Sequence, residues 1–419
     1  MRKEEVDTLD DVFDQFLSNT HFFKDRDVLR HDYVPEKLPH REDQIRSLGM
    51  IVAPLLKNER SSNVFVYGKT GTGKTAVMKY VLNRLVQKSV EFGVPLKVAY
   101  VNCRLAGTEY RVFTSLCDTL SVHVPFTGLA VGEVFDRFKR GLETQGHLLI
   151  VVLDELDELI KTKGDVLLYE LTRVNEALSN SRVSIVGISN DLRFKELLEP
   201  RVLSSLSEEE VVFRPYDASE LQDILLERAE IAFQKDVLLD GALSLCAALA
   251  ASEHGDARRA LDLLRVAAEV AERENANAIE ADHVRAAEKR IEHDRITEAL
   301  TNLTPHSKLS LYSVYILSKA NVYSATTGDI FEVYTELCRE VGISPLTQRR
   351  VSGLINELDA MGLLNARVVS RGRYGRTKKI SLAIPRTPLK EVYANDAHLE
   401  GLTDFSPNCL RQRFGKTRR

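Results

Sequence analysis

The stretch GKTGTGKT, residues 68–75, has the residue types and spacing of a phosphate-binding loop. It follows the strand-like run 63–67 and opens a helical pattern at Lys74. Its glycines permit a tight turn with inward N–H groups, and the helix N-terminus adds the positive end of its dipole. We expect Lys74 to reach the β- and γ-phosphates of ATP or ADP, and the Thr75 hydroxyl to bind Mg²⁺. The expected nucleotide contacts are Gly68, Gly71, Thr72, Gly73, Lys74, Thr75 and Ala76.

A second motif, HLLIVVLDELDEL at 147–159, ends an apolar run in two carboxylates. A carboxylate at the end of a strand beside the phosphate loop suits Mg²⁺, so Asp154 is expected to hold the metal through a bound water. Glu155 is expected to act as the general base that deprotonates the attacking water. Asp157 and Glu158 are interpreted as solvated charges at the start of a helix.

The elements that must position these residues follow an alternating pattern. Strand-like runs at 63–67, 97–101, 147–153 and 183–188 are separated by amphipathic helical stretches. Such alternation predicts a parallel sheet covered on both faces. After Phe213 the pattern turns helical, with Asp217 and Glu220 placed as an N-cap pair, and it stays helical to about Glu292. A third region from Thr297 holds three short helices and two strand-like runs.

Composition excludes several classes of protein. The chain has 419 residues, 28% charged and 44% hydrophobic, which fits two or three globular domains. No apolar run reaches the roughly 18 residues of a membrane helix, and the N-terminus lacks the pattern of a secretory signal. The five cysteines form no CxxC pair, which argues against a disulfide framework or a zinc site and favours the cytosol.

With both motifs in place, the chain resembles the AAA+ ATPases. In that class a further strand ends in a polar sensor of the γ-phosphate, and SIVGISND, 184–191, puts Asn190 there. LEPRVLSSL, 198–206, resembles the segment of the arginine finger, so Arg201 would act on the nucleotide of a neighbouring subunit. From the residues alone, Asn190 could also be a turn residue and Arg201 a surface arginine.

The same resemblance extends to the hinge and the lid. Tyr216 in FRPYDASEL, 213–221, is similar to the family residue that packs on adenine, and Arg228 lies further along that helix. Arg258 in GDARRALDLL resembles the second sensor of the phosphates, and 33–42 resembles the segment that caps the base. The resemblance implies a catalytic set of Lys74, Asp154, Glu155, Asn190, Arg201 and Arg258.

Within the AAA+ class the chain resembles the archaeal origin-recognition and cell-division-cycle type initiators of DNA replication. The resemblance lies in YVPEKLPHREDQI at 33–45, in the sequences around Arg201 and Arg258, and in a long stretch at 102–138. That stretch is expected to form two helices joined by VPFTGL, 124–129, like the initiator-specific insertion that presses on the DNA minor groove. Thr127 and Gly128 are the expected contacts.

The C-terminal region adds a basic loop in a chain of net charge −4. From Thr297 onward there are 18 Lys and Arg against 11 Asp and Glu, whereas the remainder has 39 against 50. SPLTQRRVSGLINEL is expected to form a helix that starts near Ser344 and Pro345, and VVSRGRYGRTKKISL a basic hairpin after it. This order resembles a winged helix, with phosphates bound by the wing and a recognition helix in the major groove. The expected DNA contacts are Gln348, Arg349, Arg350, Arg371, Arg373, Tyr374, Arg376 and Lys378.

Other interpretations of the hairpin and of the C-terminal tail stay open. The hairpin could be a solvated loop or a phosphoprotein site. The tail 411–419 could add non-specific attraction to DNA or be plain disordered charge.

The implied fold is an α/β AAA+ base with a parallel sheet at 1–215, an all-α lid at 216–295, a C-terminal winged-helix DNA-binding domain at 296–395 and a basic tail at 396–419. The implied function is an ATP-dependent replication initiator, a slow, switch-type ATPase that uses ATP/ADP and Mg²⁺. Its implied partners are duplex origin DNA, an MCM-type replicative helicase, and a second copy or paralogue on adjacent DNA. No membrane role is expected, and the expected place is the cytoplasm, at the nucleoid.

Three rival functions remain open. One is an ATP-switched transcription regulator with a winged helix, which would not need the insertion at 102–138. A second is a clamp-loader-like ATPase, which would not need the basic hairpin. A third is an initiator paralogue that serves regulation without loading a helicase.

Overall fold

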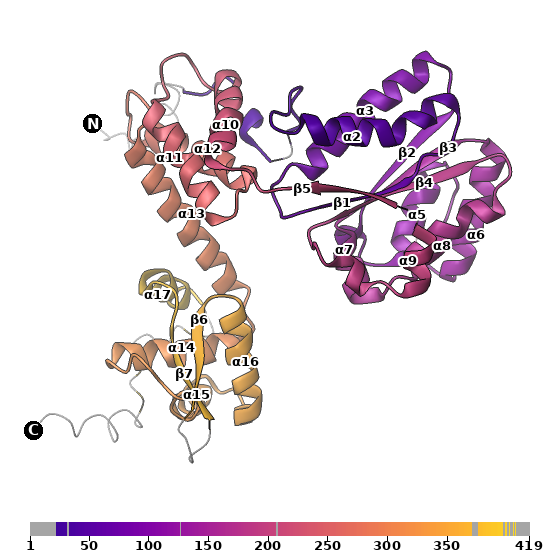
Figure 1. Ribbon diagram of the computed structural model, residues 1–419. Helices are drawn as coiled ribbons and strands as arrows, with labels where there is room; N and C mark the ends of the chain where they lie inside the picture. The colour runs from indigo at the N-terminus through magenta and orange to yellow at the C-terminus, as the bar shows by residue number, and fades with distance from the viewer. Residues whose placement is uncertain are drawn as a thin grey trace, which may run out of the picture. The chain divides into compact units, whose positions relative to one another are not determined.

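A computed structural model describes residues 22–31, 33–125, 127–206, 208–370, 376–396, 399, 402, 405 and 407. The chain divides into two compact units, Met1–Ala287 and Glu288–Arg419, whose boundary lies within helix α13 (Ala281–Thr301) (Figure 1). In the part of the chain that the structure describes, no helix is both long and apolar enough to cross a membrane.

The first unit is built on a five-stranded parallel sheet in the order β2-β3-β4-β1-β5. The strands are β1 (Asn63–Gly68), β2 (Leu96–Asn102), β3 (Leu148–Asp154), β4 (Arg182–Ser189) and β5 (Glu208–Phe213). β1, β3 and most of β4 are buried, because they are apolar runs covered on both faces. Since all five strands are parallel, their carboxyl ends share one edge, where the phosphate loop follows β1 and Asp154 ends β3.

Helices cover both faces of this sheet (Figure 1). One face packs α2 (Glu42–Val52), the 3₁₀ turn η2 (Ala53–Lys57) and α3 (Lys74–Glu91) around a core that includes Leu48, Val77 and Met78. The other face packs a larger core under α5 (Glu109–Thr119), α6 (Val131–Gln145), α7 (Leu156–Lys163), α8 (Val166–Arg173) and α9 (Pro200–Leu206). Short turns complete this layer at α4 (Cys103–Ala106), η3 (Val174–Ala177) and η4 (Phe194–Leu197). The predicted parallel sheet covered on both faces is therefore confirmed.

The stretch 102–138 forms α4, α5 and the first half of α6. α5 and α6 pack together through Phe113 and Phe135, whose ring centroids lie 5.0 Å apart. The segment that joins these two helices contains Thr127 and Gly128.

The lid consists of α10 (Ala218–Ala232), α11 (Asp240–Glu253) and α12 (Ala257–Arg273), and α13 follows it in sequence. The short N-terminal turn η1 (Asp27–Leu29) contacts α10 and α12. The expected N-cap pair is a capping box: Asp217 accepts from the N–H of Glu220, and the Glu220 side chain accepts from the N–H of Asp217. Glycine at position 255 closes the turn before α12 with a φ of 67°, and an added Cβ would meet the carbonyl of Tyr216.

The second unit is a winged helix made of α14 (Pro305–Lys319), α15 (Thr327–Val341), α16 (Gln348–Ala360), the hairpin β6 (Leu364–Ser370) and β7 (Arg376–Leu382), and α17 (Arg386–Ala394). α14, α15, α16 and the hairpin share one apolar core. Ala325 adds a short antiparallel bridge to Ile380 of β7.

The expected start of the recognition helix was wrong. α16 begins at Gln348, with Thr347 as its N-cap, so Pro345 lies before the helix and not in its first turn. The Thr347 hydroxyl accepts from the N–H of Arg350, and the N–H of Leu346 donates to the hydroxyl of Tyr334. These two bonds stabilise an extended entry where the sequence alone allowed a helix.

Candidate functional site

A cavity of about 420 Å³ lies at the carboxyl edge of the sheet. The phosphate loop lines it from the sheet, the segment 33–39 from the N-terminal side, and α10 and α12 from the lid. Most of the residues expected to contact nucleotide line this one cavity: Gly71, Thr72, Gly73, Lys74, Thr75, Ala76, Asp154, Glu155, Asn190, Tyr216, Arg228 and Arg258.

The phosphate loop turns through two glycines with left-handed backbone, Gly71 at φ 72° and Gly73 at φ 88°. A side chain at either position would be strained there. Gly68 does not line the cavity, because it packs against β5, where an added Cβ would lie 2.6 Å from the carbonyl oxygen of Phe213. Its observed role is therefore the close approach of two strands.

Lys74 lies at the bottom of the loop with a side chain only 6% exposed. Its Nζ donates to the carbonyls of Gly68 at 2.7 Å and Lys69 at 2.8 Å, and to Oδ1 of Asn190 at 2.8 Å. Burial lowers the pKa of Lys74 to about 8, although the negative charge of Asp154 opposes that shift. The ammonium and the expected sensor are thus in direct contact.

Asp154 collects three donors. Its Oδ2 accepts from the hydroxyls of Thr75 at 3.1 Å and Tyr100 at 2.5 Å, and its Oδ1 accepts from the N–H of Glu155. Burial and the charge of Asp154 raise the pKa of Tyr100 far above its ordinary value, so this hydroxyl stays protonated and donates. The carboxylate and hydroxyl oxygens of Asp154 and Thr75 are the hard ligands that Mg²⁺ prefers, so the residues fit that ion. Sequence reasoning missed Tyr100, which lies on the neighbouring strand.

Glu155 takes a left-handed backbone, φ 53°, at the turn between β3 and α7. Its Oε2 accepts from the side-chain amide of Asn102 at 3.3 Å. Sequence reasoning missed Asn102 as well, although the polar residue after the apolar run 97–101 was a usable signal. Asn102 pairs in register with Asp154, so the two strand ends bring Asn102 beside Glu155.

The interpretation of Asp157 as a solvated charge was wrong. Its side chain is 2% exposed, and its Oδ1 accepts from the N–H of Asn190 at 3.2 Å. α7 begins at Leu156, so Asp157 lies in the first helical turn and contacts the end of β4. The buried carboxylate therefore fixes the backbone of the expected sensor.

Three lid and hinge residues face the same cavity. Arg258 lies in the first turn of α12 and lines the cavity. The N–H of Ala257, the first residue of the same helix, donates to the carbonyl of Gly71 at 3.1 Å. Tyr216 is buried at the hinge. Arg228 is buried beneath Tyr33, with its guanidinium carbon 4.5 Å from the ring centroid.

Arg201 does not reach this cavity in its own chain. It is exposed at the start of α9, where its Nε lies 2.7 Å from Oε2 of Glu199. Its guanidinium lies over the ring of Tyr169 at 5.0 Å. Its expected action on a neighbouring subunit stays a prediction.

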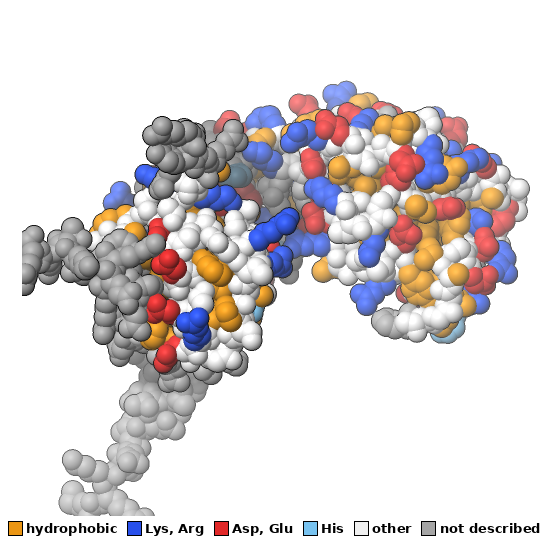
Figure 2. Space-filling model, turned by 90° about the horizontal axis from the view of Figure 1, so that it is seen from below, with side chains coloured by type: hydrophobic (Ala, Val, Ile, Leu, Met, Phe, Trp, Pro, Cys, Tyr) orange, Lys and Arg blue, Asp and Glu red, His pale blue; other side chains and the backbone are white. Residues whose placement is uncertain are grey.

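Five of the expected DNA contacts are exposed in the described part of the chain, two in the first unit and three in the second. Thr127 and Gly128 are exposed between α5 and α6. Gln348, Arg349 and Arg350 are exposed in the first turn of α16. On the face shown in Figure 2, basic and acidic side chains of the base are interspersed.

Lys378 lies on β7, and its Nζ donates to Oδ1 of Asn356, which connects the hairpin to α16. Arg371, Arg373 and Tyr374 lie outside the described residues, as does the tail 411–419, and of Arg376 only the backbone is described.

Three family models match the chain in sequence. They are an AAA domain at residues 57–194, a Cdc6 AAA+ ATPase-type lid domain at 222–289, and the CDC6 C-terminal winged helix domain at 298–392. Together they confirm the predicted fold class of AAA+ base, helical lid and winged helix.

Similar proteins cover nearly the whole chain. The ORC1-type DNA replication protein of Thermococcus onnurineus is 50% identical over 96% of this chain and 98% of its own, and that of Pyrococcus furiosus is 49% identical over 97% and 98%. The structure of the Aeropyrum pernix ORC1 protein in complex with DNA is 48% identical, with a TM-score of 0.82 over 91% of this chain and 99% of its own. The family that the sequence resembled is thereby confirmed: the chain belongs to the ORC1-type DNA replication proteins.

Proposed function

We propose that this chain is an ATP-dependent replication initiator that binds duplex origin DNA and helps to load the replicative helicase. The observation that carries the proposal is the single cavity that joins Lys74, Asp154 and Asn190 of the base to Arg258 of the lid, in a chain that also has a winged helix. Membership of the ORC1-type DNA replication proteins supports the choice among AAA+ functions.

In the proposed nucleotide site, the ammonium of Lys74 and the guanidinium of Arg258 bind the phosphates from opposite sides, base and lid. Asn190 contacts the γ-phosphate while Asp157 fixes its backbone. Tyr216 and Arg228 contribute to the subsite for adenine. Thr75 and Asp154 would hold Mg²⁺, which supplies positive charge at the β- and γ-phosphates.

Hydrolysis in this proposal is slow and resets a conformational switch. Glu155 accepts the proton of the attacking water. Its hydrogen bond to Asn102 occupies one carboxylate oxygen, which supports a slow basal rate. Arg201, exposed and outside the cavity of its own chain, completes the site of a second copy or paralogue on adjacent DNA.

The proposed DNA grip has two parts. Gln348, Arg349 and Arg350 at the start of α16 enter the major groove, and the hairpin contacts phosphates through Arg371, Arg373, Tyr374, Arg376 and Lys378. Thr127 and Gly128 of the insertion contact a second point on the duplex. Two contacts along one duplex bend or underwind it, so part of the specificity comes from DNA deformability.

The remaining parts of the proposal concern partners and place. The ATP-bound form recruits an MCM-type helicase, and the protein works in the cytoplasm at the nucleoid, without a membrane partner. The Aeropyrum pernix ORC1 protein, which was solved with DNA, supports DNA as the ligand.

Fluorescence anisotropy tests this function with labelled duplexes from the intergenic repeats beside the gene, with ATP·Mg²⁺ or ADP·Mg²⁺ and at several salt concentrations. We expect particular repeats to bind about 10³-fold or more tightly than scrambled duplex. Replacing both Arg371 and Arg373 with Ala should remove most of that affinity. Replacing Arg285 and Arg290 with Ala removes the same charge from α13 and is the matched control. Weak, sequence-blind binding that the wing variant leaves unchanged would refute the initiator function.

A further inference from the structure

The N-terminal segment brings one arginine into the interior of the first unit. Arg41 is the N-cap residue of α2 and is 0% exposed. Its Nε donates to the carbonyl of Thr72 at 3.0 Å, its Nη1 to that of His40 at 2.9 Å and its Nη2 to that of Arg214 at 2.8 Å. A buried guanidinium is tolerated only where such acceptors surround it, so its charge depends on all three segments staying in place.

One of these bonds acts on the phosphate loop directly. The carbonyl of Thr72 and the N–H of Gly73 belong to one planar peptide group and point in opposite directions. Because Arg41 binds the carbonyl, it also fixes the direction of the Gly73 N–H, which is one of the donors expected to face the phosphates. The loop is thus oriented by a residue from outside its own motif.

Two contacts of Arg41 lie at the hinge that leads into the lid, one to the backbone of Arg214 and one to the ring of Tyr216. Arg214 precedes the hinge and accepts from Arg41 through its backbone. The guanidinium of Arg41 also stacks on Tyr216, with its central carbon 3.7 Å from the ring centroid. A shift of the phosphate loop would therefore be passed through Arg41 to Arg214 and Tyr216 at the hinge.

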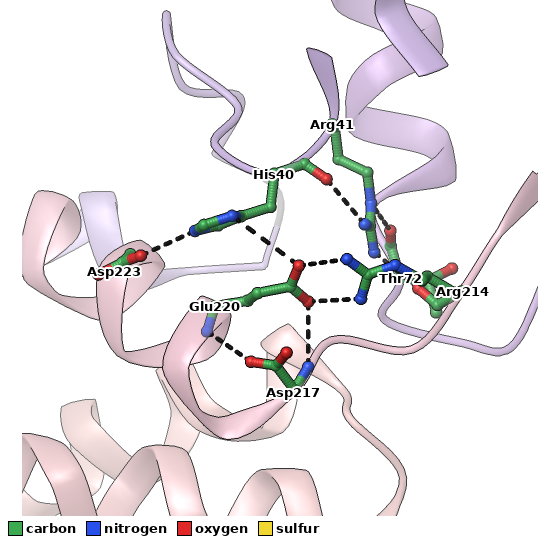
Figure 3. Close-up of polar contacts among 7 residues, drawn as sticks. All are labelled: His40, Arg41, Thr72, Arg214, Asp217, Glu220 and Asp223. Atoms are coloured by element: carbon green, nitrogen blue, oxygen red, sulfur yellow. Dashed lines mark hydrogen bonds and ion pairs between the residues drawn. The ribbon is translucent and has the colours of Figure 1, made fainter. Parts of the chain in front are cut away.

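A polar network continues from this point into the first turn of α10 (Figure 3). The guanidinium of Arg214 binds both oxygens of Glu220, at 2.9 and 2.5 Å. Glu220 belongs to the capping box of α10, and His40 lies 3.8 Å from its carboxylate. His40 also contacts Asp223, one turn further, at 2.8 Å. The segment His40–Arg41 thus contacts the phosphate loop at one end and the start of α10 at the other.

We propose that Arg41 is a positioning residue that orients the Thr72–Gly73 peptide for phosphate binding and transmits occupancy of the phosphate loop to the first turn of α10. This inference rests on the proposed nucleotide binding. The chain contains a second link that does not involve Arg41, because the N–H of Ala257 donates directly to the carbonyl of Gly71. The two links lead to different lid helices, so they can be separated.

The test compares the parent chain with Arg41→Met and Arg41→Lys. Arg46→Met on the exposed side of α2 is the matched control, and Lys74→Ala is the control for nucleotide binding itself. Affinity is measured with a fluorescent ADP analogue. Hydrogen exchange is followed at saturating ADP·Mg²⁺ in peptides that cover 68–76, 214–224 and 255–262.

We expect Arg41→Met to bind the analogue about tenfold or more weakly, because a hydrogen bond from a charged donor to the loop is lost. At saturation its loop peptide 68–76 and its α12 peptide 255–262 should be protected as in the parent. Its hinge peptide 214–224 should lose the protection that nucleotide gives the parent. Arg41→Lys should be intermediate, because an ammonium keeps the charge but lacks the forked geometry.

Parent-like protection of 214–224 in a folded Arg41→Met variant would overturn the proposal and leave Arg41 a purely structural residue. If that variant does not fold, the same criterion applies to Arg41→Lys. Binding by Lys74→Ala that equals the parent would instead overturn the proposed nucleotide site, a result that the Arg41 variants alone cannot produce.

Discussion

The side-chain amide of Asn102 donates to the carboxylate of Glu155 at 3.3 Å, from the end of the strand next to the one that Glu155 follows. The oxygen of the same amide accepts from the N–H of Leu105 and caps the short helix α4. One side chain therefore connects the expected general base to the start of the insertion. While this bond holds, one oxygen of Glu155 is occupied.

Replacing Asn102 with Ser should raise the basal rate of ATP hydrolysis about tenfold or more, the value of one hydrogen bond to a charged acceptor. Serine keeps the N-cap of α4 but is too short to reach Glu155. Steady-state phosphate release measures the effect. An unchanged or lower rate, in a variant that melts like the parent, would mean that Asn102 does not restrain the base.

Replacing Lys74 with Ala should abolish nucleotide binding and leave the affinity for bare DNA largely intact. The ammonium is buried in the phosphate loop, whereas Gln348, Arg349 and Arg350 are exposed and do not line that cavity. Calorimetry with ATP·Mg²⁺ and anisotropy with duplex give the two affinities. Equal loss of both would indicate general unfolding rather than a local effect.

Replacing Glu155 with Gln should trap the ATP state, because an amide cannot accept the proton of the attacking water. Nucleotide affinity should stay within a few-fold of the parent, while single-turnover hydrolysis should fall by about 10²-fold or more. Hydrolysis at the parental rate would show that another group acts as the base.

Nucleotide affinity should fall as the pH rises through about 8, the value to which burial lowers the pKa of Lys74. Below that pH the ammonium is charged and binds phosphate, and above it the amine is neutral in the free protein. The dissociation constant should then rise by about tenfold per pH unit. Titrations from about pH 7 to about pH 9.5 cover the window. Lys74→Arg stays charged and should give a flat profile, so a flat parental profile would contradict this role.

Replacing Asp157 with Ala should lower the free energy of unfolding by about 1–3 kcal/mol, because it leaves the half-buried N–H of Asn190 without this acceptor. Asp157→Asn keeps an acceptor oxygen and should cost less. The exposed neighbour Glu158, replaced by Ala, is the control. Denaturant unfolding gives the comparison, and equal stability of the Ala variants at 157 and 158 would refute the buried role.

Features carried by local pattern were predictable from the sequence. The phosphate loop has a fixed spacing, and its flanks 63–67 and 74–91 form the strand and helix that this motif requires. Asp217 and Glu220 are three residues apart and form the capping box that such spacing indicates. These elements depend on a few neighbouring residues, so a short stretch of sequence is enough to predict them.

Features set by tertiary contacts were not predictable. β5 was not predicted, because its sequence EEEVVF begins with three acidic residues. It forms a strand because it pairs with β1. Arg41 and Asp157 are polar residues that only the fold buries, and Tyr100 is half-buried where its hydroxyl contacts Asp154. Burial of a polar side chain depends on what packs over it, which a local pattern does not record.

The most direct test of the proposed function is salt-resistant retention of the host's MCM-type helicase on closed circular origin DNA. Parent protein with ATP·Mg²⁺ should retain the helicase on origin circles and not on scrambled ones. Lys74→Ala should bind the circles yet retain no helicase. Origin-specific binding by the parent without helicase retention, or retention that Lys74→Ala supports equally well, would contradict ATP-dependent helicase loading. The first of these results would favour an ATP-switched winged-helix regulator.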